Sequence, residues 1–190
     1  MNNPNGIIVF GASGSGTTTL GRELARVLNF EHHDIDDYVW KPTTPSYTQM
    51  RSQNERVTLL RSAIKGDFVL SGCLREWEGA FDDMLRLAVF IKTPTELRLE
   101  RVEQREYARY GDRIKPGGDM YEKHRSFAEY IATYDTGSIE SRSLASQTAW
   151  LKTLACPVIE VCGVDDFQKT AKKVAKIAFG QNRQDEEDIL

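Results

Sequence analysis

The chain has 190 residues, of which 40% are hydrophobic and 28% are charged, and its formal net charge is −3. This length and composition are typical of one folded domain with a hydrophobic core, and they exclude a largely disordered chain. The 25 basic and 28 acidic residues are too evenly balanced for a nucleic-acid-binding surface over the whole chain. The apolar runs are far shorter than the roughly 18 residues that a membrane span needs.

The cysteines and the first residues of the chain indicate the cellular compartment. Cys73, Cys156 and Cys162 are widely spaced and odd in number, so they predict neither a disulfide framework nor a zinc site. The opening MNNPNG lacks the charged-then-apolar pattern of a signal peptide. We therefore expect a cytoplasmic protein that binds neither nucleic acid nor membrane. A homodimer remains open, because no sequence feature reports the oligomeric state.

Short apolar runs alternate with longer segments of helical periodicity. Strands are predicted at 7–10, 30–34, 68–71, 88–91 and 158–161, and helices at 17–28, 47–64, 94–110, 121–134, 141–154 and 166–178. Continuous apolar strands joined by helices are typical of an α/β fold whose parallel sheet is covered on both faces. Thr93 is the predicted cap of the helix that starts at Pro94. We expect a single domain over 1–180 and an acidic tail at 181–190.

The strongest motif is GASGSGTT, which follows the first predicted strand and opens the first helix. It fits the phosphate-loop pattern G-x-x-x-x-G-K-[ST] except at the lysine, which is Thr17. Glycines let such a loop curl so that its N–H groups face a phosphate, and the helix dipole adds attraction. The candidate nucleotide-binding residues are Gly11, Ala12, Ser13, Gly14, Ser15, Gly16, Thr17, Thr18 and Thr19. The Thr18 hydroxyl is also a candidate ligand for Mg²⁺.

Two alternatives concern this loop. A dinucleotide-binding fingerprint, G-x-G-x-x-G, fails because Thr19 stands at its third glycine. The missing lysine is the larger question, since threonine neither reaches as far nor carries charge. Either another cation replaces it, with Lys41 and Lys115 as candidates, or the protein binds a nucleotide without transferring its phosphate.

Acidic residues follow the second predicted strand. Asp34 and Asp36 would lie on one side of an extended segment, at the sheet edge where α/β proteins bind ligands. One carboxylate could hold Mg²⁺ while the other accepts a hydrogen bond from, or deprotonates, a substrate hydroxyl. The alternative is an Asp-rich turn that caps the next element.

Several basic residues are candidates for anion binding. Arg98, Arg101, Arg105 and Arg109 fall on one helix face, and guanidinium groups suit phosphoryl oxygens. A solvated helix face with salt bridges is the alternative. After the third strand, Gly72 would allow close approach of a ligand and Arg75 would bind an anionic substrate, with Arg56 as a weaker candidate. The segments 38–48 and 110–120 are candidate mobile flaps over the site, or plain surface loops.

These motifs together resemble the small P-loop kinases, the superfamily of nucleoside monophosphate kinases and shikimate kinases, over most of 6–178. The resemblance rests on GASGSGTT, DID, SGCLR and PTELRLERVEQRE, and it extends to bacterial adenylate kinase-like P-loop proteins. It implies a three-layer α/β P-loop NTPase fold with a five-stranded parallel sheet in the order 2-3-1-4-5. It also implies a mobile substrate-binding segment near 36–60, a mobile arginine-bearing lid near 105–120, and ATP with Mg²⁺.

The resemblance also assigns roles. Asp34 matches the acid on the metal side, Asp36 the catalytic acid on the substrate side, and Arg105 and Arg109 the catalytic arginines of the lid. The implied function is Mg²⁺-dependent transfer of the ATP γ-phosphate to a hydroxyl or phosphate of a small metabolite, such as a nucleotide or a shikimate- or gluconate-like acid. The alternative, from Thr17, is a nucleotide-binding regulator or pseudo-kinase.

Overall fold

Five strands form one parallel sheet in the computed structural model, which describes residues 4–74 and 77–180. The strands are β1 Gly6–Gly11, β2 Glu31–Asp34, β3 Phe68–Ser71, β4 Leu85–Lys92 and β5 Val158–Cys162. Their order across the sheet is β2-β3-β1-β4-β5, and every neighbouring pair is parallel. The predicted α/β class and strand order are therefore confirmed. The expected tail at 181–190 and Arg75 lie outside the described residues.

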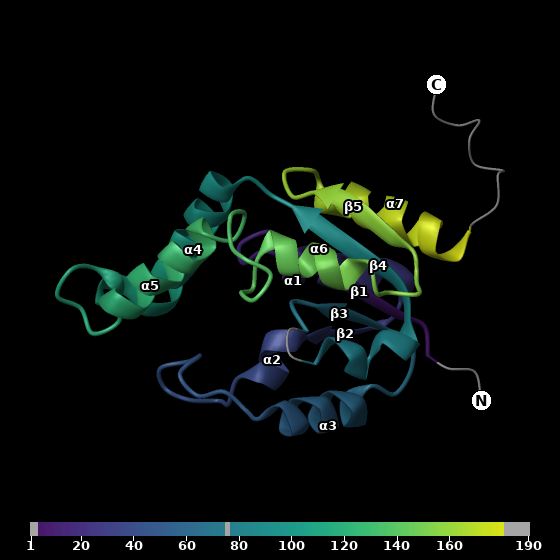
Figure 1. Cartoon of the computed structure of the whole chain (residues 1–190), viewed down its shortest axis with the longest axis horizontal. Helices are drawn as coiled ribbons and strands as arrows, with labels where there is room; N and C mark the ends of the chain where they lie inside the picture. The colour runs from purple at the N-terminus through teal and green to yellow at the C-terminus, as the bar shows by residue number, and fades with distance from the viewer. Residues whose placement is uncertain (1–3, 75–76, 181–190) are drawn as a thin grey trace.

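Helices cover both faces of the sheet (Figure 1). Alternate residues of β1 point to opposite faces, because successive side chains of a strand alternate. Ile7 and Val9 pack in a core with α1, Thr17–Leu28, and α7, Phe167–Phe179. Ile8 and Phe10 pack in a second core, which α2, α3 and α6 cover. These three helices span Ile35–Val39, Gln53–Ala63 and Leu144–Leu151.

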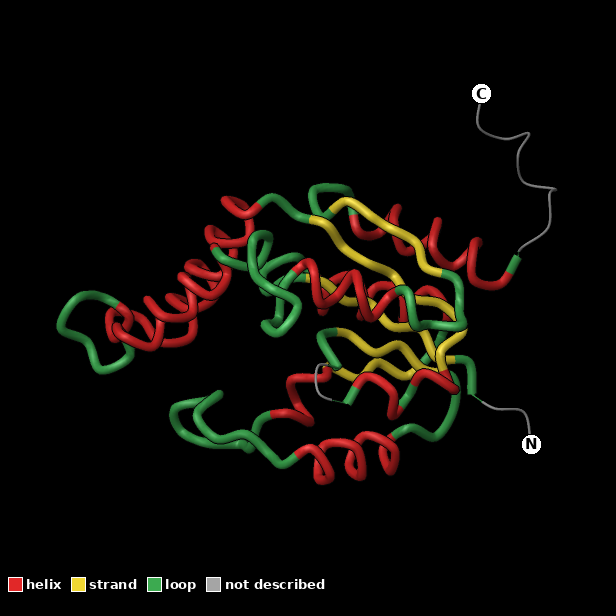
Figure 2. Tube along the Cα trace, viewed as in Figure 1, coloured by secondary structure: helices red, strands yellow, loops and turns green. Residues whose placement is uncertain are grey.

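Two segments extend beyond the carboxyl ends of the strands. Helices α4, Thr95–Tyr110, and α5, Tyr121–Ala132, pack side by side and are joined through the short helix η3, Gly111–Ile114. Figure 2 shows this helical pair and the loop before α3 extending on the same side of the sheet. Two further single-turn helices, Glu78–Ala80 and Asp82–Met84, precede β4. No helix in the described ranges is long and apolar enough to cross a membrane.

The structure corrects three local predictions. The helix expected at 47–64 starts only at Gln53, because Ser52 caps it in a reciprocal capping box with Glu55. The short helix α2 was not predicted, since its five residues are too few to show a helical period. Thr93 does not cap α4: Pro94 is the residue before the helix, and the Thr93 hydroxyl donates instead to the carbonyl oxygen of Ser15 at 3.2 Å.

Candidate functional site

The phosphate loop lies between β1 and α1 and depends on two glycines with left-handed backbones. Gly14 has φ +83° and Gly16 has φ +99°. A Cβ atom on Gly14 would lie 2.5 Å from the carbonyl oxygen of Arg98, and one on Gly16 would lie 2.5 Å from the ring of Phe167. The loop thus packs closely against both α4 and α7. Only glycine combines these dihedral angles with such close approach.

Neighbouring elements hold the carbonyl groups of the loop. The amide of Ser15 donates to the carbonyl oxygen of Ala12 at 3.1 Å, which closes the turn. Arg101 donates to the carbonyl oxygens of Gly14 at 3.4 Å and of Gly163 at 2.8 Å. With carbonyl groups held from outside and the first amides of α1 lacking partners within the helix, the loop is suited to bind an anion. The Ser15 hydroxyl is buried and has no partner, whereas Thr19 is exposed.

A hydroxyl and a carboxylate meet at the start of α1. Thr18 Oγ1 donates to Asp34 Oδ2 at 2.9 Å, and Asp34 Oδ1 accepts the amide of Asp36 at 3.1 Å, which caps α2. Mg²⁺ commonly binds one or two protein oxygens and completes its shell with water and phosphate. The pair fits that pattern. Within 4–74 and 77–180, no group of three or more His, Cys, Asp or Glu side chains could hold a metal ion by itself.

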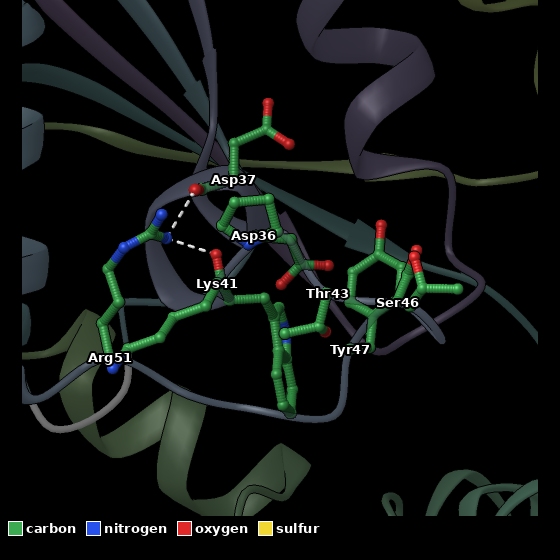
Figure 3. Close-up of a pocket in the computed structure, with 10 residues that line it drawn as sticks. Asp36, Asp37, Lys41, Thr43, Ser46, Tyr47 and Arg51 are labelled. Atoms are coloured by element: carbon green, nitrogen blue, oxygen red, sulfur yellow. Dashed lines mark hydrogen bonds between the residues drawn. The ribbon is translucent and has the colours of Figure 1, made fainter.

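Asp36 lies among charged groups at the edge of a pocket. Desolvation by the surrounding protein, helped by the charge of Asp34, raises the pKa of Asp36, while Arg142 and Arg105 act to lower it. The side chain nevertheless remains open to the solvent of the pocket. In Figure 3 the Asp36 carboxylate points toward the side of the pocket that holds Thr43 and Tyr47, and Asp37 points away. A carboxylate with a raised pKa at an open pocket is suited to accept a proton from a bound hydroxyl.

The pocket beside Asp36 has a volume of about 620 Å³. It is lined by acidic, basic, hydroxyl and aromatic side chains, namely Asp36, Asp37, Trp40, Lys41, Pro42, Thr43, Thr44, Ser46, Tyr47 and Arg51 (Figure 3). Arg51 closes one side by donating to the carbonyl oxygens of Asp37 and Trp40. The lining falls within the predicted substrate-binding segment and offers several hydrogen-bond partners to a small polar molecule.

The arginines on one face of α4 separate into different environments. Arg98 is fully buried and pairs with Asp135, three residues after the end of α5, so it joins α4 to the segment that follows α5. Arg101 holds the outside of the phosphate loop. The charge of Arg105 acts on Asp36, and Arg109 pairs with Glu106 at 3.3 Å. Helical spacing alone did not reveal this division, because the partners of Arg98, Arg101 and Arg105 come from other parts of the chain.

The loop before α3 touches the helical pair at Tyr47. The Arg109 guanidinium lies 4.4 Å from the centre of the Tyr47 ring, and Lys123 Nζ donates to the Tyr47 carbonyl oxygen at 2.5 Å. Tyr110 also donates to the carbonyl oxygen of Ser46 at 3.1 Å. Tyr47 has φ +61°, an unusual angle for a bulky residue, and these contacts hold it there. The two predicted flaps therefore meet across the site.

Three other candidate residues, Gly72, Arg56 and Lys115, contact parts of the protein that lie next to them. Gly72 has φ +119°, and a Cβ there would lie 3.1 Å from Cβ of Ile35, so its close contact is with α2. Arg56 is buried and donates to the carbonyl oxygen of Arg51 at 2.8 Å, which holds the end of the loop on α3. Lys115 forms an ion pair with Asp112 at 2.6 Å on the surface between α4 and α5. The substrate roles of Gly72 and Arg56 stay predictions.

Sequence reasoning missed Arg142 and Tyr47. Arg142 Nη2 donates to the carbonyl oxygen of Gly11, the first residue of the loop, at 3.3 Å. It comes from the segment between α5 and α6, which carries no motif, and the hydrogen bond joins residues that are 131 positions apart. Tyr47 fell both in the predicted flap at 38–48 and at the start of the predicted helix at 47–64, and the structure places it in the loop.

This sheet order, phosphate loop and helical pair define the fold of the small P-loop kinases. The chain belongs to a family of P-loop proteins described as the AAA domain, whose model matches residues 7–126. An uncharacterized protein of Bacillus subtilis, YqaC, is 36% identical over 165 residues, which are 84% of this chain and 91% of YqaC. The predicted P-loop family is thus confirmed, and the resemblance to the small kinases is one of fold.

Solved structures share the fold at low sequence identity. The shikimate kinase of Bacteroides thetaiotaomicron has a TM-score of 0.54 and 14% identity, over 92% of this chain and 97% of that one. The shikimate kinase of Aquifex aeolicus has a TM-score of 0.52 and 19% identity, over 92% and 96%. That of Acinetobacter baumannii, solved with shikimate, has 0.52 and 18%, over 92% of both chains. These similarities show the fold that surrounds the site.

Proposed function

We propose that the protein is a Mg²⁺-dependent kinase that transfers the γ-phosphoryl group of ATP to a small polar acceptor. The observation that carries this proposal is the hydrogen bond of 2.9 Å between Thr18 and Asp34. It joins the phosphate loop directly to the acidic segment that continues to Asp36 and the pocket. A nucleotide site and an acceptor site are thereby adjacent, which is the arrangement that phosphoryl transfer requires.

Each part has a role in this proposal. The backbone amides of the loop bind phosphate oxygens, and Gly14 and Gly16 leave the space for them. Thr18 and Asp34 hold Mg²⁺. Arg105 and Arg109, on the lid, neutralise charge on the transferred group. Positioning and charge neutralisation account for most of the catalysis in this class of reaction.

The acceptor hydroxyl binds in the pocket with its proton toward Asp36. The acceptor oxygen forms a bond to the γ-phosphorus while the bond from that phosphorus to the bridging oxygen of ADP breaks. The proton of the hydroxyl goes to the Asp36 carboxylate. The products are a phosphorylated acceptor and ADP, and Asp36 releases its proton to solvent.

The pocket suggests the class of acceptor. Its mixed lining of carboxylates, cations and hydroxyls suits a small metabolite with several hydroxyl groups and an anionic group. The solved relatives include shikimate kinases, which favours hydroxy acids of the shikimate or gluconate kind. Nucleosides and nucleoside monophosphates are the other class to test.

The test is phosphoryl transfer from γ-labelled ATP and Mg²⁺ to a panel of sugar acids, shikimate, nucleosides and nucleoside monophosphates. Asp36→Asn is expected to lower turnover by about 10² to 10⁴-fold while ATP binding persists, because a positioned base contributes that much. Asp34→Ala is expected to remove the Mg²⁺ dependence of ATP binding. Asp83→Asn, at an exposed carboxylate of a single-turn helix, is the matched control. Transfer that is equal in Asp34→Ala and the native protein would contradict the proposal.

Thr17 favours a second candidate, a nucleotide-binding regulator or pseudo-kinase, since it supplies no charge to the phosphates. In that case the native protein binds ATP without transferring phosphate to any acceptor, and Thr17→Lys creates activity. If the native protein turns over and Thr17→Lys leaves the rate unchanged or lowers it, another cation already performs the function of the lysine, and the kinase proposal holds.

A further inference from the structure

The phosphate loop lacks its usual cation, and Arg142 lies where one is needed. Arg142 Nη2 donates to the carbonyl oxygen of Gly11 at 3.3 Å, so its guanidinium group touches the first residue of the loop. On its other side the charge of Arg142 acts on Asp36, the residue proposed to face the acceptor. Arg142 therefore lies next to both the first residue of the loop and the residue proposed to face the acceptor.

Arg142 is held firmly in this position. Ser143, the next residue, caps α6 in a reciprocal capping box with Ser146, and its hydroxyl also donates to the carbonyl oxygen of Ser138 at 2.6 Å. The amide of Leu144 donates to the carbonyl oxygen of Tyr134 at 2.9 Å. These bonds attach the segment to α6 and to the residues that follow α5. The guanidinium is therefore placed before any ligand arrives, which is what electrostatic stabilisation of a transferred group requires.

Arg142 also has hydrogen-bonding capacity to spare. Its Nε is buried and has no partner. Burial alone would lower the pKa of Arg142, but Cys73, Tyr130 and Asp36 nearby outweigh that effect and raise the pKa, so the group carries its charge. A buried charged donor without an acceptor is unfavourable, and a phosphate oxygen would satisfy it.

Several other cations near the site have different partners. Arg101 binds three backbone carbonyl groups of the loop and its surroundings, and Lys115 pairs with Asp112 on the exposed surface near η3. Arg105 acts on Asp36 and Lys41 lines the pocket, whereas Arg142 both contacts the loop and acts on Asp36.

We propose that Arg142 replaces the missing lysine of the phosphate loop and binds the γ-phosphate of ATP. This inference rests on the proposed function and names a residue that completes it. Arginine offers a planar set of donors to phosphate oxygens, so a guanidinium from outside the loop can supply the charge that Thr17 cannot.

The test measures Mg²⁺-ATP and Mg²⁺-ADP binding by calorimetry for the native protein, Arg142→Met, Arg142→Lys, and Arg142→Met combined with Thr17→Lys. We expect Arg142→Met to weaken ATP binding by about tenfold or more and ADP binding much less, because charged hydrogen bonds to the γ-phosphate are lost. Arg142→Lys should recover part of the affinity. In the double variant, the Thr17→Lys substitution should restore ATP binding, which a role for Arg142 in folding or in acceptor binding would not allow.

The control is Arg125→Met, which removes an exposed arginine paired with Glu122 and Glu129 on α5. Thermal denaturation of each variant checks folding, and Arg142→Lys keeps the test valid if Arg142→Met does not fold. If the native protein binds ATP and all variants bind it equally, Arg142 does not contact the γ-phosphate and the inference is wrong. If the native protein binds no ATP, the proposed function itself fails.

Discussion

Glycine at two positions of the phosphate loop does more than permit a turn. Gly14 and Gly16 have positive φ angles, and each also lies where a side chain would collide with another element. The obstacle for Gly14 is the backbone of α4, which cannot move aside as a flexible side chain can. The loop conformation and the position of α4 are therefore coupled at Gly14.

Gly14→Ala is expected to destabilise the protein by about 1–3 kcal/mol, because it combines a strained backbone with a clash. It should also abolish ATP binding, since the loop must move. Thermal denaturation and calorimetry with Mg²⁺-ATP measure the two effects. Gly66→Ala is the control, because no atom lies within 4 Å of the added methyl group and Gly66 has no positive φ. A normal stability and affinity in Gly14→Ala would refute the described loop packing.

At the scale of the elements, α4 joins the phosphate loop to the lid. Its first turns contact the loop through Arg98 and Arg101, and its last turn contacts Tyr47 through Arg109. Arg98 contacts the residues that follow α5: it pairs with Asp135 and lies 5.0 Å from the centre of the Tyr134 ring, and it also donates to Thr95 Oγ1 at 2.5 Å within α4. Helix α4 therefore contacts both the phosphate loop and the loop before α3.

Arg98→Met should lower the free energy of unfolding by about 2–4 kcal/mol, because it removes a buried charge and its interactions with Asp135 and Thr95. The loss is smaller than for a fully buried pair, since the side chain of Asp135 is 43% exposed and can be hydrated. Chemical denaturation provides the measurement. Arg125→Met, whose ion pairs are exposed, should change the stability little. Equal effects of the two substitutions would contradict the structural role of Arg98.

At the scale of the whole molecule, the loop before α3 and the helical pair α4–α5 contact each other beyond the carboxyl ends of the strands. Their contact consists of Tyr47 with Arg109 and Lys123, and of Ser46 with Tyr110. Because the two segments belong to different parts of the chain, movement of one is expected to affect the other. A few polar contacts of this kind are typical of segments that separate with a small free energy of opening.

Tyr47→Ala removes the ring under Arg109 and should destabilise the closed arrangement by about 1–2 kcal/mol, so amide exchange would be about 5–30 times faster. Hydrogen exchange followed by mass spectrometry should show this increase in both 41–50 and 107–123. Tyr107→Ala is the control, since Tyr107 contacts Asp112 and Lys115 within the lid alone. Faster exchange in only one of the two segments after Tyr47→Ala would show that they are independent.

The sequence by itself determined the sheet, the phosphate loop and the acidic segment. Each is a local pattern: five apolar runs of strand length, a glycine-rich junction and acids directly after a strand. Helix α1 and strand β3 have the predicted bounds. The start of α3 was missed, because a capping box at Ser52 competes with a helical pattern that continues upstream of it.

Only the tertiary structure decided which charged groups lie around the phosphate loop. The arginines of α4 share one helix face, but burial, backbone carbonyl groups and different acidic partners give each a different environment. Arg142 carries no local signal, because its position beside Gly11 arises from packing of a segment 131 residues away. Local patterns report backbone conformation and burial, whereas the meeting of distant charges depends on how the elements pack, and the contact of Arg142 with the loop is of this second kind.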